Sequence, residues 1–183
     1  MPRDWNLYYC DPAHRDPPPD PLLVEVAELA PPGDALELAC GAGSNAIYLA
    51  SLGWRVTAVD RSGVAIGILR ERAGYLPLSA MAADLECGEF QIAPDSFDLI
   101  ADFYYLHRAL FPQIRQGLRP GGIFVAAIHM VDPDAAGGPH HPDFLLEPGE
   151  LRSEFAGWKI SFYSEARLPG RSRRAARIVA RRA

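Results

Sequence analysis

The sequence predicts an α/β protein whose doubly wound, mostly parallel seven-stranded sheet carries one antiparallel strand near its edge. First, short apolar strand-like segments alternate with segments of helical periodicity along most of the chain, which is typical of a parallel sheet covered on both faces. Second, the last two apolar segments, residues 158–164 and 173–180, are joined by a short link at Leu168-Pro169-Gly170, and such a link requires antiparallel pairing. Third, a length of 183 residues with 49% hydrophobic content fits a single ordinary globular domain.

The first predicted helix covers residues 22–30, where apolar residues recur at helical spacing before Pro31-Pro32-Gly33 ends the helix. A second helix is expected at residues 45–52, and a third runs from a cap at Ser62 to about residue 73. The fourth is predicted at residues 105–118, stopped by Pro120-Gly121-Gly122. Five strands precede the final pair, at residues 35–39, 55–59, 78–82, 97–101 and 123–129.

Residues 1–21 are predicted to form an N-terminal arm, and residues 22–183 a single domain. Proline fixes φ and removes a backbone donor, so the proline-rich residues 11–21 are expected to be extended. The arm carries Trp5, Tyr8, Tyr9 and Arg15. These residues are candidates for a lid, although the aromatic ones serve equally well as pegs in the core.

Composition argues against several classes of protein. A net charge of -5 gives no footprint for nucleic acid, and the arginines between residues 171 and 182 alternate with apolar residues as on a solvated edge strand. The sequence contains no run of about 18 apolar residues, so no membrane-spanning helix is expected. The first residues show neither a basic start followed by an apolar stretch nor a cleavage site, so no export signal is expected. Three widely spaced cysteines suit a reducing cytoplasm and no metal site, and His140-His141 reads as part of a loop.

One stretch, LELACGAGSN at residues 36–45, carries the chemistry. Gly41 and Gly43 allow a ligand to approach the backbone closely, and Glu37 places a carboxylate inside the preceding strand, where a cationic ligand would favour it. Asp60 ends the next strand, where a carboxylate can accept both hydroxyls of a ribose. The plainer alternatives are a core carboxylate at Glu37 and a helix cap at Asp60. A dinucleotide-binding dehydrogenase shares the turn, but Asn45 stands near the place of the missing third glycine.

These residues resemble the class I S-adenosylmethionine-dependent methyltransferases, whose fold is Rossmann-like. Glu37 to Gly43 is similar to the first motif of that family, Leu118-Arg119-Pro120-Gly121-Gly122 to its turn before the fifth strand, and Ala83-Asp84-Leu85 to its adenine-contacting motif. More narrowly, GSNAIYLASLGWRVTAVD and PDFLLEPGEL resemble the bacterial tellurite-resistance-related group. One departure is Ala39 in place of the motif's first glycine, which is tolerable if that position only packs.

The resemblance implies a set of residues that bind S-adenosylmethionine. The backbone of Gly41, Ala42 and Gly43 is expected to contact the methionine part, and Cys40 and Asn45 flank it in the same site. Asp60 takes the ribose hydroxyls and Arg61 flanks the adenine. Asp84 accepts from the adenine amino group, the amide of Leu85 donates to the ring, and Phe103 lies beside the reactive end.

The predicted function is methyl transfer to an unidentified small molecule. The alternatives are a nicotinamide-dependent oxidoreductase and a non-catalytic module that binds S-adenosylmethionine. No catalytic residue is assigned, because transfer from a sulfonium needs mainly positioning. The tentative acceptor residues are Tyr104, Tyr105, His107 and Arg108, and the long stretch at residues 131–146 is a candidate lid. The oligomeric state is left open.

Overall fold

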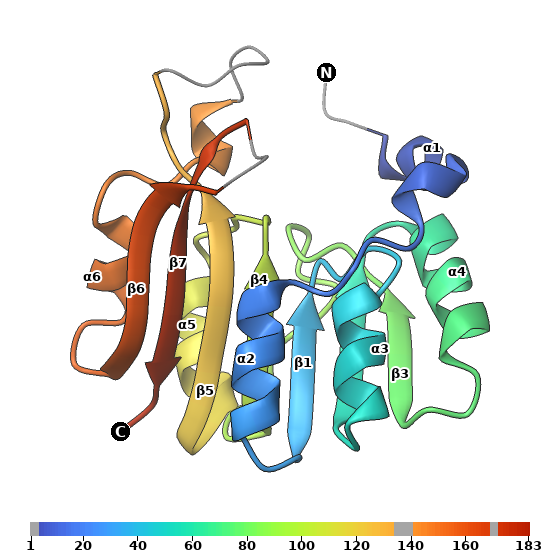
Figure 1. Ribbon diagram of the computed structural model, residues 1–183, viewed down its shortest axis with the longest axis horizontal. Helices are drawn as coiled ribbons and strands as arrows, with labels where there is room; N and C mark the ends of the chain where they lie inside the picture. Colours follow the sequence, from blue (N-terminus) through green and yellow to red (C-terminus); the bar gives the residue numbers. More distant parts are fainter. Residues whose placement is uncertain (1–3, 134–140, 169–171) are drawn as a thin grey trace. The chain divides into compact units, whose positions relative to one another are not determined.

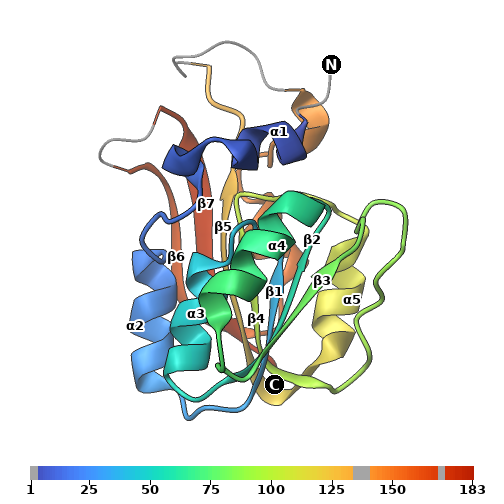
Figure 2. The same ribbon diagram turned by 90° about the vertical axis from the view of Figure 1, so that its right-hand side faces the viewer.

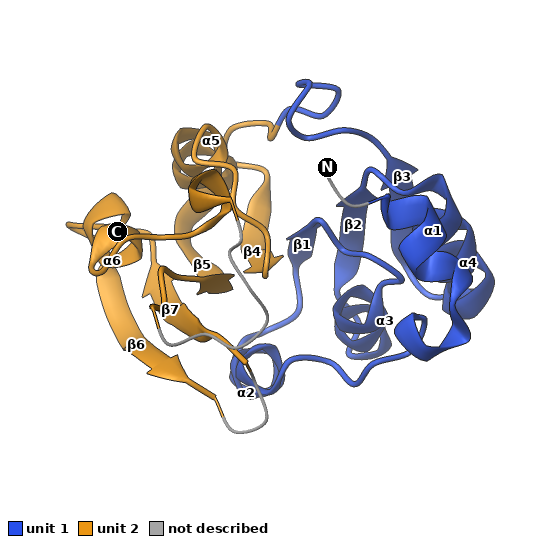
Figure 3. Cartoon of the chain, turned by 90° about the horizontal axis from the view of Figure 1, so that it is seen from above, with its two compact units in different colours: residues 1–91 blue, residues 92–183 orange. Residues whose placement is uncertain are grey.

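The structure is a computed structural model and describes residues 4–133, 141–168 and 172–183. The chain divides into two compact units, residues 1–91 and residues 92–183 (Figure 3). Its seven strands form a mixed sheet in which β7 (Arg174–Arg181) runs antiparallel to the strands on both of its sides, so the predicted fold class is confirmed. The predicted boundary between an arm and a domain at residue 21 stays a prediction.

The first unit contains three parallel strands in the order β3-β2-β1: β1 (Asp34–Leu38), β2 (Arg55–Asp60) and β3 (Leu78–Ala82). Helices α2 (Pro21–Leu29), α3 (Ser44–Ser51) and α4 (Gly63–Ala73) accompany them (Figure 1). Glu37 pairs in register with Ala58, and Val59 with Met81. Because these strands are parallel and in register, the segments that follow β1, β2 and β3 meet at one edge of the sheet.

Local signals fix the helix starts of this unit. Asp20 caps α2 by accepting a hydrogen bond from the amide of Leu22 at 2.9 Å, and Pro21 stands at the first helical position, where its missing N–H is harmless. Ser62 caps α4 through its hydroxyl, which accepts from the amide of Ala65 at 3.1 Å. The predicted cap at Ser62 is therefore confirmed.

The N-terminal arm differs from the prediction, because it is partly helical. Helix α1 (Trp5–Cys10) lies before the segment that was expected to be extended, and the 3₁₀ turn η1 (Pro12–His14) replaces part of that segment. Asp4 caps α1 and Asp11 caps η1, where Pro12 occupies the first position of the turn. Proline only forbids the interior of a helix, so it is compatible with such a start. Figure 2 shows α1 lying over the N-terminal end of α4.

The second unit contains β4 (Phe97–Phe103), β5 (Leu118–His129), β6 (Lys159–Arg167) and β7 (Arg174–Arg181) in the order β4-β5-β7-β6. Strand β7 runs antiparallel to both β5 and β6, as the short link predicts; Pro169 and Gly170 of that link lie outside the described residues. The arginine-rich segment was predicted to be an edge strand, which is wrong. It forms β7, and the buried Ala176, Ile178 and Ala180 fix it between two partners.

The helices of this unit are α5 (Leu110–Gly117), η2 (Pro142–Phe144) and α6 (Glu150–Glu154). The prediction that α5 starts at residue 105 is wrong. Tyr104 has a left-handed φ of 64° and donates its amide to the carbonyl of Ala127 at 2.6 Å, so the backbone leaves the helical path there. A start at Leu110 also places Pro112 in the first turn, where no amide is needed; an earlier start would bury it in the helix interior.

Candidate functional site

The turn after β1 is held in a left-handed path by three residues. Ala39, Gly41 and Gly43 have φ values of 50°, 56° and 79°. The amide of Gly41 donates to Asp60 Oδ2 at 2.8 Å, and that of Gly43 donates to the carbonyl of Cys40 at 3.0 Å. Position 39 therefore does more than pack, because its left-handed φ favours glycine and strains the alanine that this chain carries.

The two glycines exclude a side chain for different reasons. A Cβ at Gly43 would overlap the Leu69 side chain of α4, so this glycine permits close packing between the turn and a helix. A Cβ at Gly41 would overlap the hydroxyl of Tyr9 and lie 3.0 Å from its Cζ. Tyr9, from α1, therefore stands directly over the turn.

Glu37 is a buried carboxylate, 3% exposed, beside the turn. Hydrogen bonds from the Asn45 side chain and the amide of Ala46 hold it, and Asn45 Oδ1 accepts from the amide of Asp20 at 2.8 Å. Within the described ranges, Glu37 Oε2 has no hydrogen-bond partner. Burial raises the pKa of Glu37 to about 8, against the lowering effect of the two hydrogen bonds. A cation at Oε2 would compensate for the burial of this charge.

Asp60 ends β2 and ties it to the turn. Its Oδ2 accepts from the amide of Gly41 and its Oδ1 from the amide of Ser62, both at 2.8 Å. Burial raises the pKa of Asp60, while these bonds and Arg61 oppose the shift. Each carboxylate oxygen has a second lone pair. Asp60 can therefore accept two further hydrogen bonds, as a ribose diol requires, and Ser62 rather than Asp60 caps α4.

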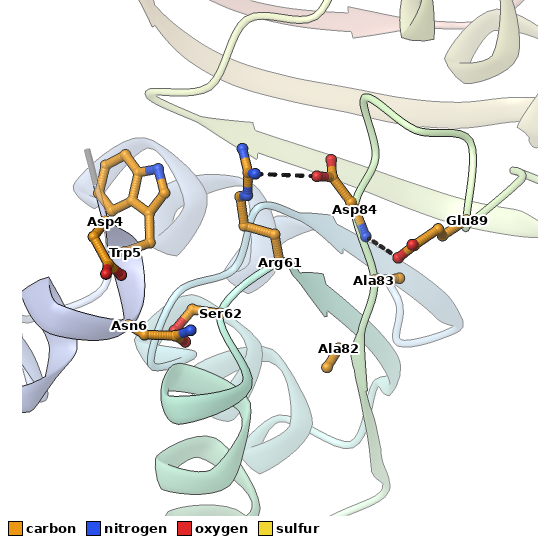
Figure 4. A pocket seen from close by; sticks show the side chains of 9 residues that line it. All are labelled: Asp4, Trp5, Asn6, Arg61, Ser62, Ala82, Ala83, Asp84 and Glu89. Carbon is orange, nitrogen blue, oxygen red and sulfur yellow. Dashed lines mark hydrogen bonds and ion pairs between the residues drawn. The ribbon is translucent and has the colours of Figure 1, made fainter. Parts of the chain in front are cut away.

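A cavity of about 460 Å³ in the first unit is lined by residues that directly follow β2 and β3 (Figure 4). Arg61 reaches across it to Asp84, with Nη2 and Oδ2 3.2 Å apart, and the amide of Asp84 donates to Glu89 at 2.8 Å. Trp5 of α1 forms another wall. The lining is Asp4, Trp5, Asn6, Arg61, Ser62, Ala82, Ala83, Asp84 and Glu89. Such a volume suits a small ligand. Leu85, the residue after Asp84, is buried.

The arm is attached to this site by polar contacts at both ends. Asn6 Oδ1 accepts from the Ser62 hydroxyl at 2.8 Å and from the amide of Val64 at 3.3 Å. Arg72 of α4 donates from Nη1 to the carbonyls of Arg15 and Ala42, both at 2.7 Å, and forms an ion pair with Asp16. Sequence reasoning found Trp5 and Tyr9 only as lid candidates and missed Asn6 entirely, since these contacts join distant segments.

The predicted acceptor residues belong to the second unit, as does Phe103, which was predicted to lie beside the reactive end of the cofactor. Phe103 ends β4, and the ring of the next residue, Tyr104, lies 6.5 Å from that of Phe103 and 5.0 Å from that of His129. Tyr105 and His107 follow as half-buried residues of the loop before α5.

Arg108 has a structural part in the second unit. It pairs with Glu150 at 2.6 Å and donates to the carbonyls of Asp143 and Leu145, both at 2.9 Å. These contacts clamp the segment before α6. Residues 134–140 of the predicted lid lie outside the described residues.

Two further properties bear on the site. Among the described residues, no cluster of three or more histidine, cysteine or acidic side chains could hold a metal ion. No helix in the same ranges has the length and apolarity needed to span a membrane.

Residues 35–122 match the family model described as a methyltransferase domain. Among curated proteins, the chain is 28% identical over 154 residues to the probable S-adenosyl-L-methionine-dependent methyltransferase TehB of Haemophilus influenzae, covering 78% of this chain and 52% of the relative. It is 31% identical over 153 residues to hemagglutinin 1 of Eikenella corrodens, covering 79% of this chain and 50% of the relative. The chain thus spans about half the length of these relatives.

Solved structures share the fold. The crystal structure of TehB from Haemophilus influenzae superposes with a TM-score of 0.75 at 24% identity, covering 88% of this chain and 61% of that one. The 1,6-didemethyltoxoflavin-N1-methyltransferase of Burkholderia thailandensis was solved with bound 1,6-didemethyltoxoflavin and S-adenosylhomocysteine. It superposes with a TM-score of 0.65 at 21% identity, covering 97% of this chain and 81% of that one. The predicted resemblance to S-adenosylmethionine-dependent methyltransferases, and to TehB in particular, is confirmed.

Proposed function

We propose that this protein binds S-adenosylmethionine in its first unit and transfers the methyl group to a small molecule. The observation that carries the proposal is Glu37, a buried carboxylate beside a glycine turn whose Oε2 lacks a partner within the described ranges. The cofactor's methionine end carries an α-ammonium group, and such a cation satisfies both the charge and the open acceptor. A pyrophosphate would instead be repelled there.

The adenosine part fits the rest of the same edge. Asp60 has lone pairs for the two ribose hydroxyls. The cavity lined by Arg61, Asp84 and Trp5 has the size and the polar groups for an adenine. In this assignment Asp84 accepts from the amino group, and Arg61 and Trp5 form the flat walls on which a base can stack. Gly41 and Gly43 shape the turn between the two ends of the ligand.

The chemistry of the bound cofactor is the donation of a methyl group from a sulfonium centre. The chain's own residues bind and orient the reactants and exclude water, which is enough for an in-line displacement with a good leaving group. No acid or base is assigned, and the catalytic residue stays unassigned.

For the acceptor we infer a site in the loop after β4. Tyr104 holds a left-handed φ of 64° between Phe103 and His129, and such outliers cluster at functional sites. Tyr105 and His107 belong to the same loop, whereas Arg108 serves mainly as a clamp. The bound compound of the toxoflavin methyltransferase supports a small molecule as the class of acceptor.

We further propose that the protein works in the cytoplasm without nucleic-acid or membrane partners. All three cysteines are free, which suits a reducing compartment, and the net charge of -5 disfavours nucleic acid.

Binding is tested by thermal unfolding with S-adenosylhomocysteine and with a nicotinamide dinucleotide. At one hundred times the dissociation constant, the right ligand stabilises by about 2.7 kcal/mol, which raises the Tm of a protein of this size by roughly 5–10 °C. A shift with the dinucleotide alone would replace the methyltransferase proposal with the oxidoreductase. A shift with S-adenosylhomocysteine but no turnover across a broad acceptor screen would favour a binding module.

A further inference from the structure

Tyr9 lies before the region that matches the family model. The matched family region begins at residue 35, whereas Tyr9 belongs to α1. Its hydroxyl lies so close to Gly41 that a Cβ there would overlap it. The Tyr9 backbone is held from the other side, because Arg15 Nε donates to its carbonyl at 3.1 Å. Asn6 and Arg72 attach the arm on either side of this point.

The surroundings of this hydroxyl consist mainly of acceptors. Burial raises the pKa of Tyr9 first, and Asp60, Tyr8, Cys40 and Glu37 raise it further. The phenol is therefore neutral at every physiological pH and keeps its proton as a donor.

The amides of Gly41 and Gly43 already donate hydrogen bonds within the protein. That of Gly41 donates to Asp60, and that of Gly43 donates to the carbonyl of Cys40. The hydroxyl of Tyr9 is a donor that stands over the turn itself.

The proposed ligand demands such a donor. Next to the α-ammonium group that Glu37 would bind, the methionine end carries a carboxylate, which needs hydrogen-bond donors and is repelled by Glu37 and Asp60. We propose that the Tyr9 hydroxyl donates a hydrogen bond to this carboxylate, so that α1 forms part of the cofactor site and selects ligands that carry an intact amino-acid end. This inference rests on the proposed function.

The test compares two ligands that differ in one group. S-Adenosylhomocysteine carries the carboxylate, and decarboxylated S-adenosylhomocysteine keeps the adenosine, the thioether and the ammonium group. Calorimetry on the full chain should show that Tyr9→Phe weakens S-adenosylhomocysteine about tenfold or more, the scale of a hydrogen bond to a charged group. Its affinity for the decarboxylated ligand should change less than about twofold. The matched control is Tyr48→Phe, which removes a hydroxyl bonded to Glu28 at 3.4 Å and should leave both affinities unchanged.

The outcomes separate the inference from the function beneath it. Equal losses for both ligands mean that Tyr9 only packs, and tighter binding of S-adenosylhomocysteine by Tyr9→Phe means that the hydroxyl obstructs the site; either result overturns the proposal while the methyltransferase function stands. Unchanged affinity for both ligands overturns it in the same way. A wild-type protein that binds neither ligand overturns the proposed function and the role of Tyr9 with it.

Discussion

The burial of Glu37 predicts that cofactor affinity depends steeply on pH below about 8. Burial raises the pKa of Glu37 to about 8, so the carboxyl is mostly protonated at pH 6 and mostly ionised at pH 9. A cationic α-ammonium binds the ionised form and lowers the pKa of Glu37 in the complex. Binding must therefore release a proton at any pH between the pKa of the complex and 8.

The size of the change in affinity depends on how far the pH lies below the pKa of Glu37. Each pH unit below 8 reduces the ionised fraction about tenfold, which corresponds to about 1.36 kcal/mol. Because about half of Glu37 is ionised at pH 8 and about 1% at pH 6, the affinity for S-adenosylhomocysteine should fall about 50-fold, or about 2.3 kcal/mol, between these two pH values. Above pH 8 the affinity should level off as Glu37 becomes fully ionised, and it should fall again only where the ligand's own ammonium group, which titrates at higher pH, loses its charge.

The folding stability should change with pH in the opposite direction to the cofactor affinity. A carboxyl whose pKa is higher in the folded state than its ordinary 4.5 binds its proton more tightly when folded, so stability is lost as the pH rises from about 4.5 to 8. At about 1.36 kcal/mol per pH unit this loss is at most about 5 kcal/mol. Glu37→Gln removes it, and we expect this variant to be more stable than the wild type at pH 8 and to bind the cofactor at least about tenfold more weakly.

The assay is calorimetry from pH 6 to 9 in pairs of buffers that differ in ionisation enthalpy, which counts the released protons directly. Urea unfolding over the same range measures stability. Glu37→Gln is the control, because it keeps the shape and removes the titration. An affinity that is constant from pH 6 to 8, or a Glu37→Gln variant that retains the wild-type slope, would refute the reasoning; in the second case Asp60, whose pKa burial also raises, becomes the titrating group.

Three further substitutions test the turn. Asp60→Asn removes a charged acceptor from two buried amides and should weaken cofactor binding by about 1.5–3 kcal/mol in calorimetry; full affinity in the folded variant would contradict the ribose assignment. Ala39→Gly should raise the free energy of unfolding in urea by about 0.5–1 kcal/mol, since relief of a left-handed φ of 50° outweighs glycine's entropy, and a loss of stability would count against this. Gly43→Ala should cost about 2–4 kcal/mol, because its Cβ meets Leu69 at a φ of 79°. Gly63→Ala, with open space around it, is the neutral control, and equal effects at both positions would argue against packing.

Much of the fold follows from local patterns that need no knowledge of the tertiary structure. The alternation of strands and helices and the short link near residue 169 predicted the seven-stranded mixed sheet. Ser62 was identified as a cap because its hydroxyl acts on an amide three residues away. The predictions were wrong where one local sequence pattern is compatible with two structures. Proline in the arm allowed a helix start as well as an extended chain, and an apolar, arginine-rich strand can be an edge strand or an inner one.

The sequence by itself also determined which chemistry gathers at the turn, since Glu37, Gly41, Gly43 and Asp60 lie at strand ends that parallel pairing brings to one edge. Only the tertiary structure decided how these groups are used. The raised pKa of Glu37 depends on its burial, and the strain at Ala39 depends on a backbone path. The position of Tyr9 over Gly41 depends on an arm that α4 holds in place. Periodicity and capping act within a few residues of the chain, whereas burial and the docking of the arm arise from contacts between segments far apart in sequence, whose spacing leaves no pattern to detect.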